Sequence, residues 1–156
     1  MKNILVCVDF LEGDKILIEK SSELVKPFGS KIWLIHIAAP DPDFVGYEVG
    51  PQYIRDSRAE ELRKEHKQLI EYANHLKENG IDAEGLLIQG ATVDMIIKES
   101  KKLNIDLIIA GHHNHNFLYN ALVGSASAKI LRNSKIPILI IPFGEELNGS
   151  VLKPSR

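Results

Sequence analysis

The sequence predicts an α/β fold in which helices cover both faces of a five-stranded parallel sheet, giving three layers. Short continuous apolar runs recur along the chain, as is typical of strands that are buried on both faces. Segments with apolar residues at helical spacing separate these runs, and they are long enough for right-handed crossovers between parallel strands. The predicted strands span residues 4–8, 32–37, 81–89, 105–110 and 136–142. This order of elements predicts a doubly wound sheet.

The first helix is predicted between the first two strands, with Asp14 as its N-cap and residues 27–29 at its end. Its inward residues at helical spacing are expected to be Leu17, Ser21, Leu24 and Phe28. In the second strand, His36 is interpreted as a hydrogen-bonded core histidine rather than as a catalyst. Residues 39–52 are rich in proline, glycine and aspartate, which predicts a long surface loop.

The second helix is predicted from about Ser57 to a left-handed stop at Asn79 and Gly80. One stripe along it holds Leu62, His66, Leu69, Ala73 and Leu76. The carboxylates and lysines of residues 58–67 are interpreted as a solvated helix face. The third strand is more polar than the others, so it is expected nearer to an edge of the sheet.

The third helix is predicted to begin with Thr92 as its N-cap. Its inward residues are expected to be Val93, Ile96 and Ile97. The fourth strand ends at Gly111, and Asp106 at its opposite end is assigned no chemistry. A fourth helix is predicted from Gly124 to about Asn133.

Composition sets the broad class of protein. The chain has 156 residues, a net charge of −2, 44% apolar residues and one cysteine. The apolar content is sufficient for a sizeable core, and one domain over residues 1–143 with a flexible tail over residues 144–156 is predicted. The near-neutral charge gives no electrostatic reason to expect binding to nucleic acid or to an anionic membrane.

Location is predicted from what the sequence lacks. No apolar run approaches the length of a membrane span, and no cleavable signal pattern stands at the N-terminus. The single cysteine, Cys7, is interpreted as a small core residue and excludes an internal disulfide. A reducing, cytoplasmic location is therefore expected.

The segment with most functional information begins at Gly111. Parallel sheets bind ligands beyond the carboxyl ends of their strands, where the strand order reverses, so Asp9 and Gly111 are expected to share one crevice. Gly111 is followed by His112, His113 and Asn114, and after nine more residues by Gly124 and Ser125 at a predicted helix start. Free amides at a helix N-terminus favour phosphate. The alternative from local sequence is that Gly111 only forms a turn and Ser125 only caps its helix.

These residues resemble the universal stress protein family. Its ATP-binding members carry glycine, two residues, glycine, nine residues, and then glycine followed by serine or threonine. The chain matches every fixed position except the second glycine, which is Asn114. The first and last strands, residues 4–9 and 136–142, also resemble those of the family, and the similarity spans nearly all of residues 2–142. The resemblance implies an adenine nucleotide alpha hydrolase-like, Rossmann-like fold.

The same resemblance implies an adenine-nucleotide site for ATP, ADP or AMP. In the alternative of slow ATP hydrolysis, Asp9 would hold a magnesium ion through the phosphates. By that similarity, Asp9 contacts the nucleotide, Ile37 offers backbone groups to adenine and Gly90 borders the base. The ribose and phosphates are held by Gly111, Gly124, Ser125 and the backbone of Ala126. His113 lies near a phosphate. Asn114 tolerates a left-handed backbone, but its side chain occupies space that glycine leaves open, so nucleotide binding could be weakened, limited to AMP or ADP, or lost.

The histidines of this loop also raise the question of a metal site. Among His112, His113 and His115, the pair His113 and His115 lies in a loop, but no cysteine or carboxylate neighbours the three in sequence. A metal site usually needs three or four converging ligands with supporting partners. The interpretation is therefore loop histidines near a phosphate, with no protein metal site.

The motifs of vigorous nucleotide enzymes are missing from the sequence. Neither a P-loop nor a Gly-x-Gly-x-x-Gly pattern occurs, and no catalytic constellation is evident. The favoured function is a dimeric, nucleotide-binding regulator of protein partners in a stress response, with the 39–52 loop as its mobile element. The alternatives are a slow ATP hydrolase or phosphotransferase that uses the same crevice, and a nucleotide-free scaffold.

The last strand is the predicted partner surface. Pro137 lacks an N–H group, which suits an edge strand, and the run from Ile136 to Pro142 is strongly apolar. An exposed edge of this kind favours pairing with a second chain, so a two-fold homodimer through this strand is predicted. The alternative is a monomer whose edge is covered by a helix.

Overall fold

The computed structural model describes residues 1–38, 51–112 and 134–142. All strand pairs are parallel, and the strands form one sheet in the order β3-β2-β1-β4-β5. The elements in chain order are β1 (Asn3–Cys7), α1 (Asp14–Val25), a 3-10 turn (Lys26–Phe28), β2 (Lys31–Ala38), α2 (Gln52–Glu78), β3 (Ala83–Gln89), α3 (Thr92–Lys102), β4 (Leu107–His112) and β5 (Ile138–Pro142). The predicted five-stranded parallel sheet is confirmed.

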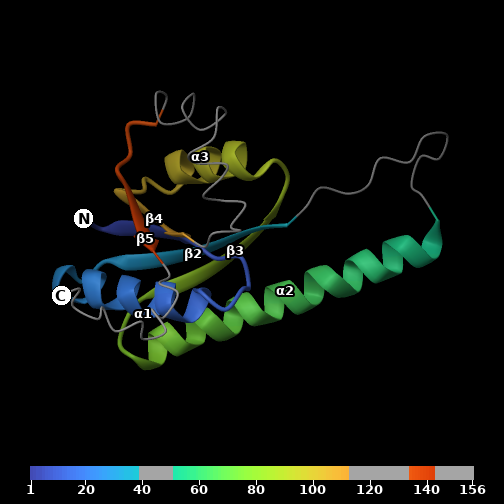
Figure 1. Ribbon diagram of the computed structural model, residues 1–156, viewed down its shortest axis with the longest axis horizontal. Coiled ribbons are helices and arrows are strands. Elements are labelled where there is room, and N and C mark those ends of the chain that lie inside the picture. The colour runs from blue at the N-terminus through green and yellow to red at the C-terminus, as the bar shows by residue number, and fades with distance from the viewer. Residues whose placement is uncertain (39–50, 113–133, 143–156) are drawn as a thin grey trace, which may run out of the picture.

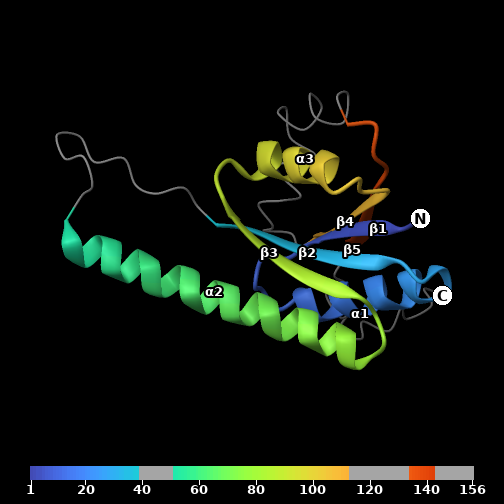
Figure 2. The same cartoon turned by 180° about the vertical axis from the view of Figure 1, so that it is seen from behind.

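Helices lie on both faces of this sheet, as the sequence predicts. Helices α1 and α2 cover one face and α3 lies on the other (Figure 1), and the reverse view in Figure 2 shows the same arrangement. The side chains of β1 contribute to the hydrophobic cores on both faces of the sheet, because successive side chains of a strand point to opposite faces. Val6 packs in the core under α1 and α2, whereas Leu5 and Cys7 pack with Ile96 under α3.

Helix α1 differs from its prediction at both ends. Gly13 occupies the N-cap position and makes no side-chain cap, so the prediction that Asp14 is the N-cap is wrong. The α-helix ends at Val25, tightens into the 3-10 turn and stops at Gly29, which has a φ of 58°. Because Val25 takes the inward position at the end of the helix, Leu24 and Phe28 are 44% and 59% exposed, contrary to the predicted stripe.

Helix α2 begins five residues before the predicted start and projects beyond the sheet (Figure 1). Its buried residues, Leu69, Ala73 and Leu76, all lie in its C-terminal half. There it approaches β3 so closely that a Cβ at Gly85 would lie 2.8 Å from Leu69 Cγ. His66 is exposed, so its place on the predicted inward stripe is wrong.

Strands β3 and β4 each begin two residues later than predicted, because the first predicted strand residue belongs to the C-terminal cap of the preceding helix. The Ile81 N–H donates to the carbonyl of Leu76, and the Ile105 N–H donates to that of Ser100. Such bonds close a helix through a residue with positive φ, here Gly80 at 78° and Asn104 at 50°. The apolar residues at 81 and 105 therefore belong to the helix ends, where both are buried.

Several other predictions concern the ends and edges of elements. Strand β3 lies at an edge, as predicted. Strand β5 lies at the opposite edge and begins at Ile138, two residues after the predicted start. Ala91, rather than Thr92, holds the N-cap position of α3. The predicted fourth helix and the tail lie outside the described residues, and so does most of the predicted 39–52 loop, since α2 already begins at Gln52.

Candidate functional site

The strand order reverses beside β1, and this reversal creates the candidate site. The chain leaves β1 toward β2 and returns from β3 to β4 on the other side of β1. In the register of β1 with β4, Cys7 pairs with Ala110. Asp9 and Gly111, which follow these residues, therefore lie at the same carboxyl edge, on the two sides of the position where doubly wound sheets bind ligands.

A tight hydrogen-bonded turn connects β1 to α1 at this edge. The N–H of Asp9 donates to Oδ1 of Asp14 over 3.2 Å, and the N–H of Phe10 donates to Oδ2 of the same carboxylate over 2.7 Å. The N–H of Leu11 donates to Oδ1 of Asp9 over 3.1 Å. The Asp14 side chain thus stabilises the turn by accepting two of its backbone N–H groups, a role that sequence reasoning missed. The available signal was a second aspartate five residues after Asp9, at the start of a helix.

The environment of Asp14 changes its proton affinity. The residue is 1% exposed, and burial raises the pKa of its carboxyl to about 7. The nearby charge of Asp9 raises the pKa further, while the two backbone hydrogen bonds lower it. The penalty of removing the carboxylate from water therefore outweighs the gain from its hydrogen bonds.

Phe10 holds an unusual backbone conformation in the same turn. Its φ is 63°, a value that few side chains adopt without cost. Its ring lies 4.2 Å from the ring of His36 and 6.1 Å from that of Tyr72, measured between centroids. The turn is therefore fixed by side-chain packing as well as by Asp14.

His36 is hydrogen-bonded, as predicted. Its Nδ1 lies 2.9 Å from the carbonyl oxygen of Val8, which can only accept, so the proton is on Nδ1. Its Nε2 lies 3.9 Å from Oε1 of Glu65. The Glu65 side chain on α2 is 26% exposed. The prediction of a solvated face for the carboxylates and lysines of residues 58–67 is therefore wrong for Glu65, which lies beside His36 of β2.

Two further predicted residues meet at the ends of β2 and β3. Ile37 pairs with Ile88, and the N–H of Gly90 donates to the carbonyl of Ala38 over 3.3 Å. Gly90 has a φ of 144°, and a Cβ there would lie 3.0 Å from Cγ of Met95. The backbone conformation therefore favours glycine at this position, and a Cβ would require Met95 to shift.

The predicted site is only partly within the described chain. Gly111 is buried and pairs with Ile141 of β5. The structure therefore brings Asp9, Ile37, Gly90 and Gly111 to the carboxyl ends of four different strands. The other predicted nucleotide contacts lie outside the described residues: His113, Asn114, Gly124, Ser125 and Ala126. Of the three loop histidines, only His112 belongs to a described strand.

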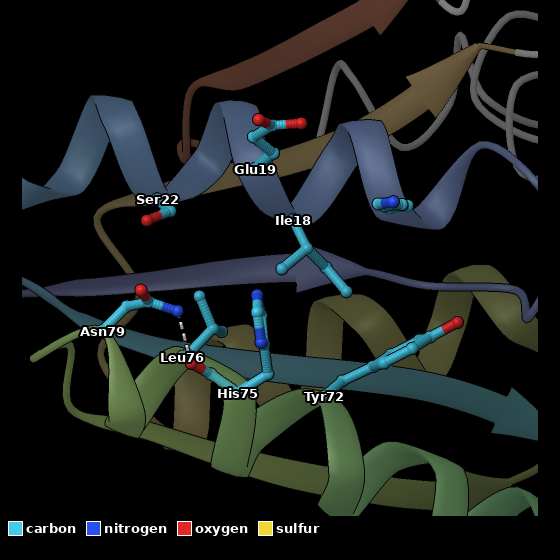
Figure 3. A pocket seen from close by; sticks show the side chains of 8 residues that line it. Ile18, Glu19, Ser22, Tyr72, His75, Leu76 and Asn79 are labelled. Atoms are coloured by element: carbon cyan, nitrogen blue, oxygen red, sulfur yellow. Dashed lines mark hydrogen bonds between the residues drawn. The ribbon is translucent and has the colours of Figure 1, made fainter.

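A separate cavity lies between α1 and α2 (Figure 3). Its volume is about 580 Å³, within the usual range for small-molecule pockets. Ile18 and Leu76 supply its apolar surface, and His75 points from α2 toward α1. Tyr72 lines this cavity and also contacts Phe10, so the cavity adjoins the turn after β1. Sequence reasoning gave no signal for it.

The sequence model of the Universal stress protein family matches residues 1–142. The chain belongs to this family. Universal stress protein C of Salmonella typhimurium is 32% identical over 145 residues, covering 90% of the chain and 95% of the relative. Universal stress protein A of Yersinia pestis is 28% identical over 152 residues, covering 95% and 96%.

Solved universal stress proteins share the fold of this one. An Arabidopsis thaliana family member described with AMP bound superposes with a TM-score of 0.65 at 20% identity, covering 96% of the chain and 97% of that structure. A universal stress protein in complex with cAMP gives 0.62 at 18% identity, covering 90% and 96%. The Archaeoglobus fulgidus protein in complex with dAMP gives 0.59 at 14% identity, covering 90% and 98%. These similarities confirm the α/β fold.

Across residues 1–38, 51–112 and 134–142, no three histidine, cysteine, aspartate or glutamate side chains form a group that could hold a metal ion. Within the same ranges, no helix has both the length and the apolar character needed to cross a membrane.

Proposed function

We propose that this universal stress protein binds an adenine nucleotide, AMP, ADP or ATP, at the carboxyl edge of its sheet and acts as a dimeric regulator in the stress response. The observation that carries the proposal is the reversal of strand order beside β1, with Asp9 on one side and Gly111 on the other. The AMP, cAMP and dAMP complexes of structural neighbours support an adenine nucleotide as the ligand.

The described residues fit the adenosine end of such a ligand. Ile37 is the second-last residue of β2, and Gly90, which follows the neighbouring strand β3, has no side chain, so a planar base could approach the main chain there. Asp9 would contact the ribose or phosphates from β1, and Gly111 would do so from β4. We assign the phosphates to His113, Asn114, Gly124, Ser125 and Ala126, with magnesium as a companion of ATP.

Glycine substitutions at two positive-φ positions test this assignment. Gly90→Ala adds a Cβ beside Met95 at the proposed base, whereas Gly29→Ala adds one at a φ of 58° with nothing within 4 Å. Both variants carry backbone strain, so both are expected to lose roughly 1 kcal/mol of unfolding free energy. Only Gly90→Ala is expected to weaken AMP binding in calorimetry. Equal affinities for the two variants would contradict the placement of the base.

The natural ligand is identified by direct analysis. Purified protein is heat-denatured and the supernatant examined by mass spectrometry, with calorimetry for AMP, ADP and ATP. An adenine nucleotide in the supernatant, or binding in calorimetry, is the expected result. Absence of both would overturn the proposal and favour the nucleotide-free scaffold. Phosphate release that Asp9→Ala abolishes without unfolding would instead favour the slow hydrolase or phosphotransferase.

We propose that the dimer forms through β5. This strand is at an edge of the sheet, and its residues from Ile138 to Ile141 are only partly buried although all are apolar. Antiparallel pairing of two such strands would satisfy their free backbone groups and cover the apolar side chains. Light scattering at micromolar concentration tests this, since a mass of 17.5 kDa is that of the monomer and would contradict it.

A further inference from the structure

Asp14 makes an unusual use of a buried carboxylate. It is the first residue of α1 and is 1% exposed, yet it does not cap its own helix, and no ion pair joins it to a cationic side chain among the described residues. Both of its oxygens accept N–H groups from the turn that leaves β1, those of Asp9 and Phe10. A carboxylate bound to two consecutive amides fixes the orientation of both peptide planes relative to the helix that carries it.

The turn needs such support because its conformation is costly. Phe10 has a φ of 63°, and a residue with a Cβ is disfavoured there. Relaxation of Phe10 to a negative φ would rotate the peptide groups on either side of it. The Asp9 side chain would move with them, because its Oδ1 accepts the N–H of Leu11 within the same turn.

We propose that Asp14 is a positioning residue for the nucleotide site: its carboxylate holds the turn after β1 so that Asp9 faces the ligand. The inference rests on the proposed nucleotide function and adds a residue to it. Asp14 is 1% exposed, so the proposal assigns it no contact with the ligand.

Protonation would weaken this support, because a neutral carboxyl accepts hydrogen bonds less strongly than a carboxylate. The burial that raises the pKa of Asp14 to about 7 brings that change into the physiological range. Among the described residues, Asp9 on the same turn and Tyr72 on α2 interact electrostatically with Asp14, and Lys15 follows it on α1. His36 of β2, with Glu65 of α2 beside it, contacts the other side of this turn at the Phe10 ring.

The chain contains a matched control for the substitution Asp14→Asn. Asp106 also accepts hydrogen bonds from two consecutive amides, those of Lys2 and Asn3. It is exposed, however, and lies where the strands begin, at the end of the sheet opposite to Asp14. Asp14→Asn is expected to weaken AMP binding at pH 8 about tenfold, the effect of losing roughly one charge-assisted hydrogen bond. Asp106→Asn is expected to leave the affinity unchanged. Equal weakening by the two variants, or full affinity in Asp14→Asn, would overturn the proposal.

A pH series separates positioning from a merely structural role. As the pH falls from 8 to 5.5, the affinity advantage of the wild-type protein over Asp14→Asn should shrink. Its stability relative to that variant should rise over the same range, because the raised pKa makes protonation favourable to the fold. Affinity that simply follows stability would contradict positioning by Asp14.

The wild-type protein gives a second readout that needs no variant. The amide resonances of Asp9 and Phe10 should titrate together with a midpoint near 7 in ¹⁵N NMR. Titration without any AMP, ADP or ATP binding would refute the proposed nucleotide function while keeping Asp14 as the support of the turn. The role of Asp14 would be refuted if these amides did not titrate between pH 5 and pH 9 and the protein bound AMP equally well at pH 5 and at pH 9.

Discussion

An aspartate accepts hydrogen bonds from two consecutive backbone amides both where the strands begin (the amino edge) and where they end (the carboxyl edge). The pKa values of these two aspartates are shifted in opposite directions. At the amino edge, hydrogen bonds from Lys2 and Asn3 lower the pKa of the exposed Asp106, and the positive N-terminus assists. At the carboxyl edge, burial and the charge of Asp9 raise the pKa of Asp14 despite equivalent bonds. The comparison teaches that solvent and neighbouring charge, rather than the hydrogen-bond pattern, decide which form of the carboxyl is favoured.

The edges also differ in how their other polar groups are arranged. At the amino edge, the Lys31 ammonium pairs with Glu84 and Asp82 at the surface, and it lies 4.3 Å from the centroid of the Trp33 ring. At the carboxyl edge, Phe10 has a strained backbone and Asp14 is a buried acid. Backbone strain and buried charge of this kind tend to accumulate where a protein binds its ligands.

The largest expected effect is an opposite pH dependence of stability for the two aspartates. The wild-type protein should lose stability relative to Asp14→Asn as the pH rises from the unfolded pKa near 4 to the folded pKa of about 7. The change in unfolding free energy across that window is on the order of 4 kcal/mol. Relative to Asp106→Asn, it should instead gain stability as the pH rises toward the ordinary aspartate pKa. Urea unfolding between pH 3 and pH 8 measures both, and slopes of the same sign would refute the comparison.

Substitutions of Phe10 are expected to have the next largest effect. Phe10→Ala and Phe10→Gly both remove the ring that packs against His36 and Tyr72. Glycine adopts the φ of 63° without penalty, so Phe10→Gly should be more stable than Phe10→Ala by about 1 kcal/mol. At the amino edge, Asn104 has a φ of 50°, and the same pair of substitutions there serves as the control. Equal thermal stability of Phe10→Ala and Phe10→Gly, together with a difference between the two Asn104 variants, would contradict this prediction. It would show that the turn after β1 does not hold residue 10 at a positive φ.

The smallest effect is expected at the surface charges of the amino edge. Glu84→Gln removes the carboxylate that pairs with Lys31, but Asp82 remains 3.7 Å from the ammonium and the Glu84 side chain is 50% exposed. The loss of unfolding free energy should be about 0.5 kcal/mol or less, and it should vanish in high salt. A loss as large as that of the Phe10 variants would show that the amino edge is also under strain.

Much of the fold was predictable because its signals are local. The apolar runs, the helical stripes and the stop at Gly80 each depend on a few neighbouring residues. Errors occur where tertiary contacts override the local pattern and where a helix cap includes residues that resemble the next strand. Leu24 and His66 fit a helical stripe by spacing, but Val25 and Glu65 take the inward positions. Ile81 and Ile105 are apolar like strand residues, yet their amides close the preceding helices.

By itself, the sequence determined the alternation of strands and helices, the parallel sheet, and the placement of Asp9 and Gly111 at strand ends. Only the tertiary structure decided that Asp14 is buried beneath the turn, that Phe10 packs on His36 and Tyr72, and that a cavity opens beside them. The physical reason is that hydrophobic period and backbone preference act over a few residues. Burial and the charge around a carboxyl depend on elements that are distant in the chain and meet only after folding.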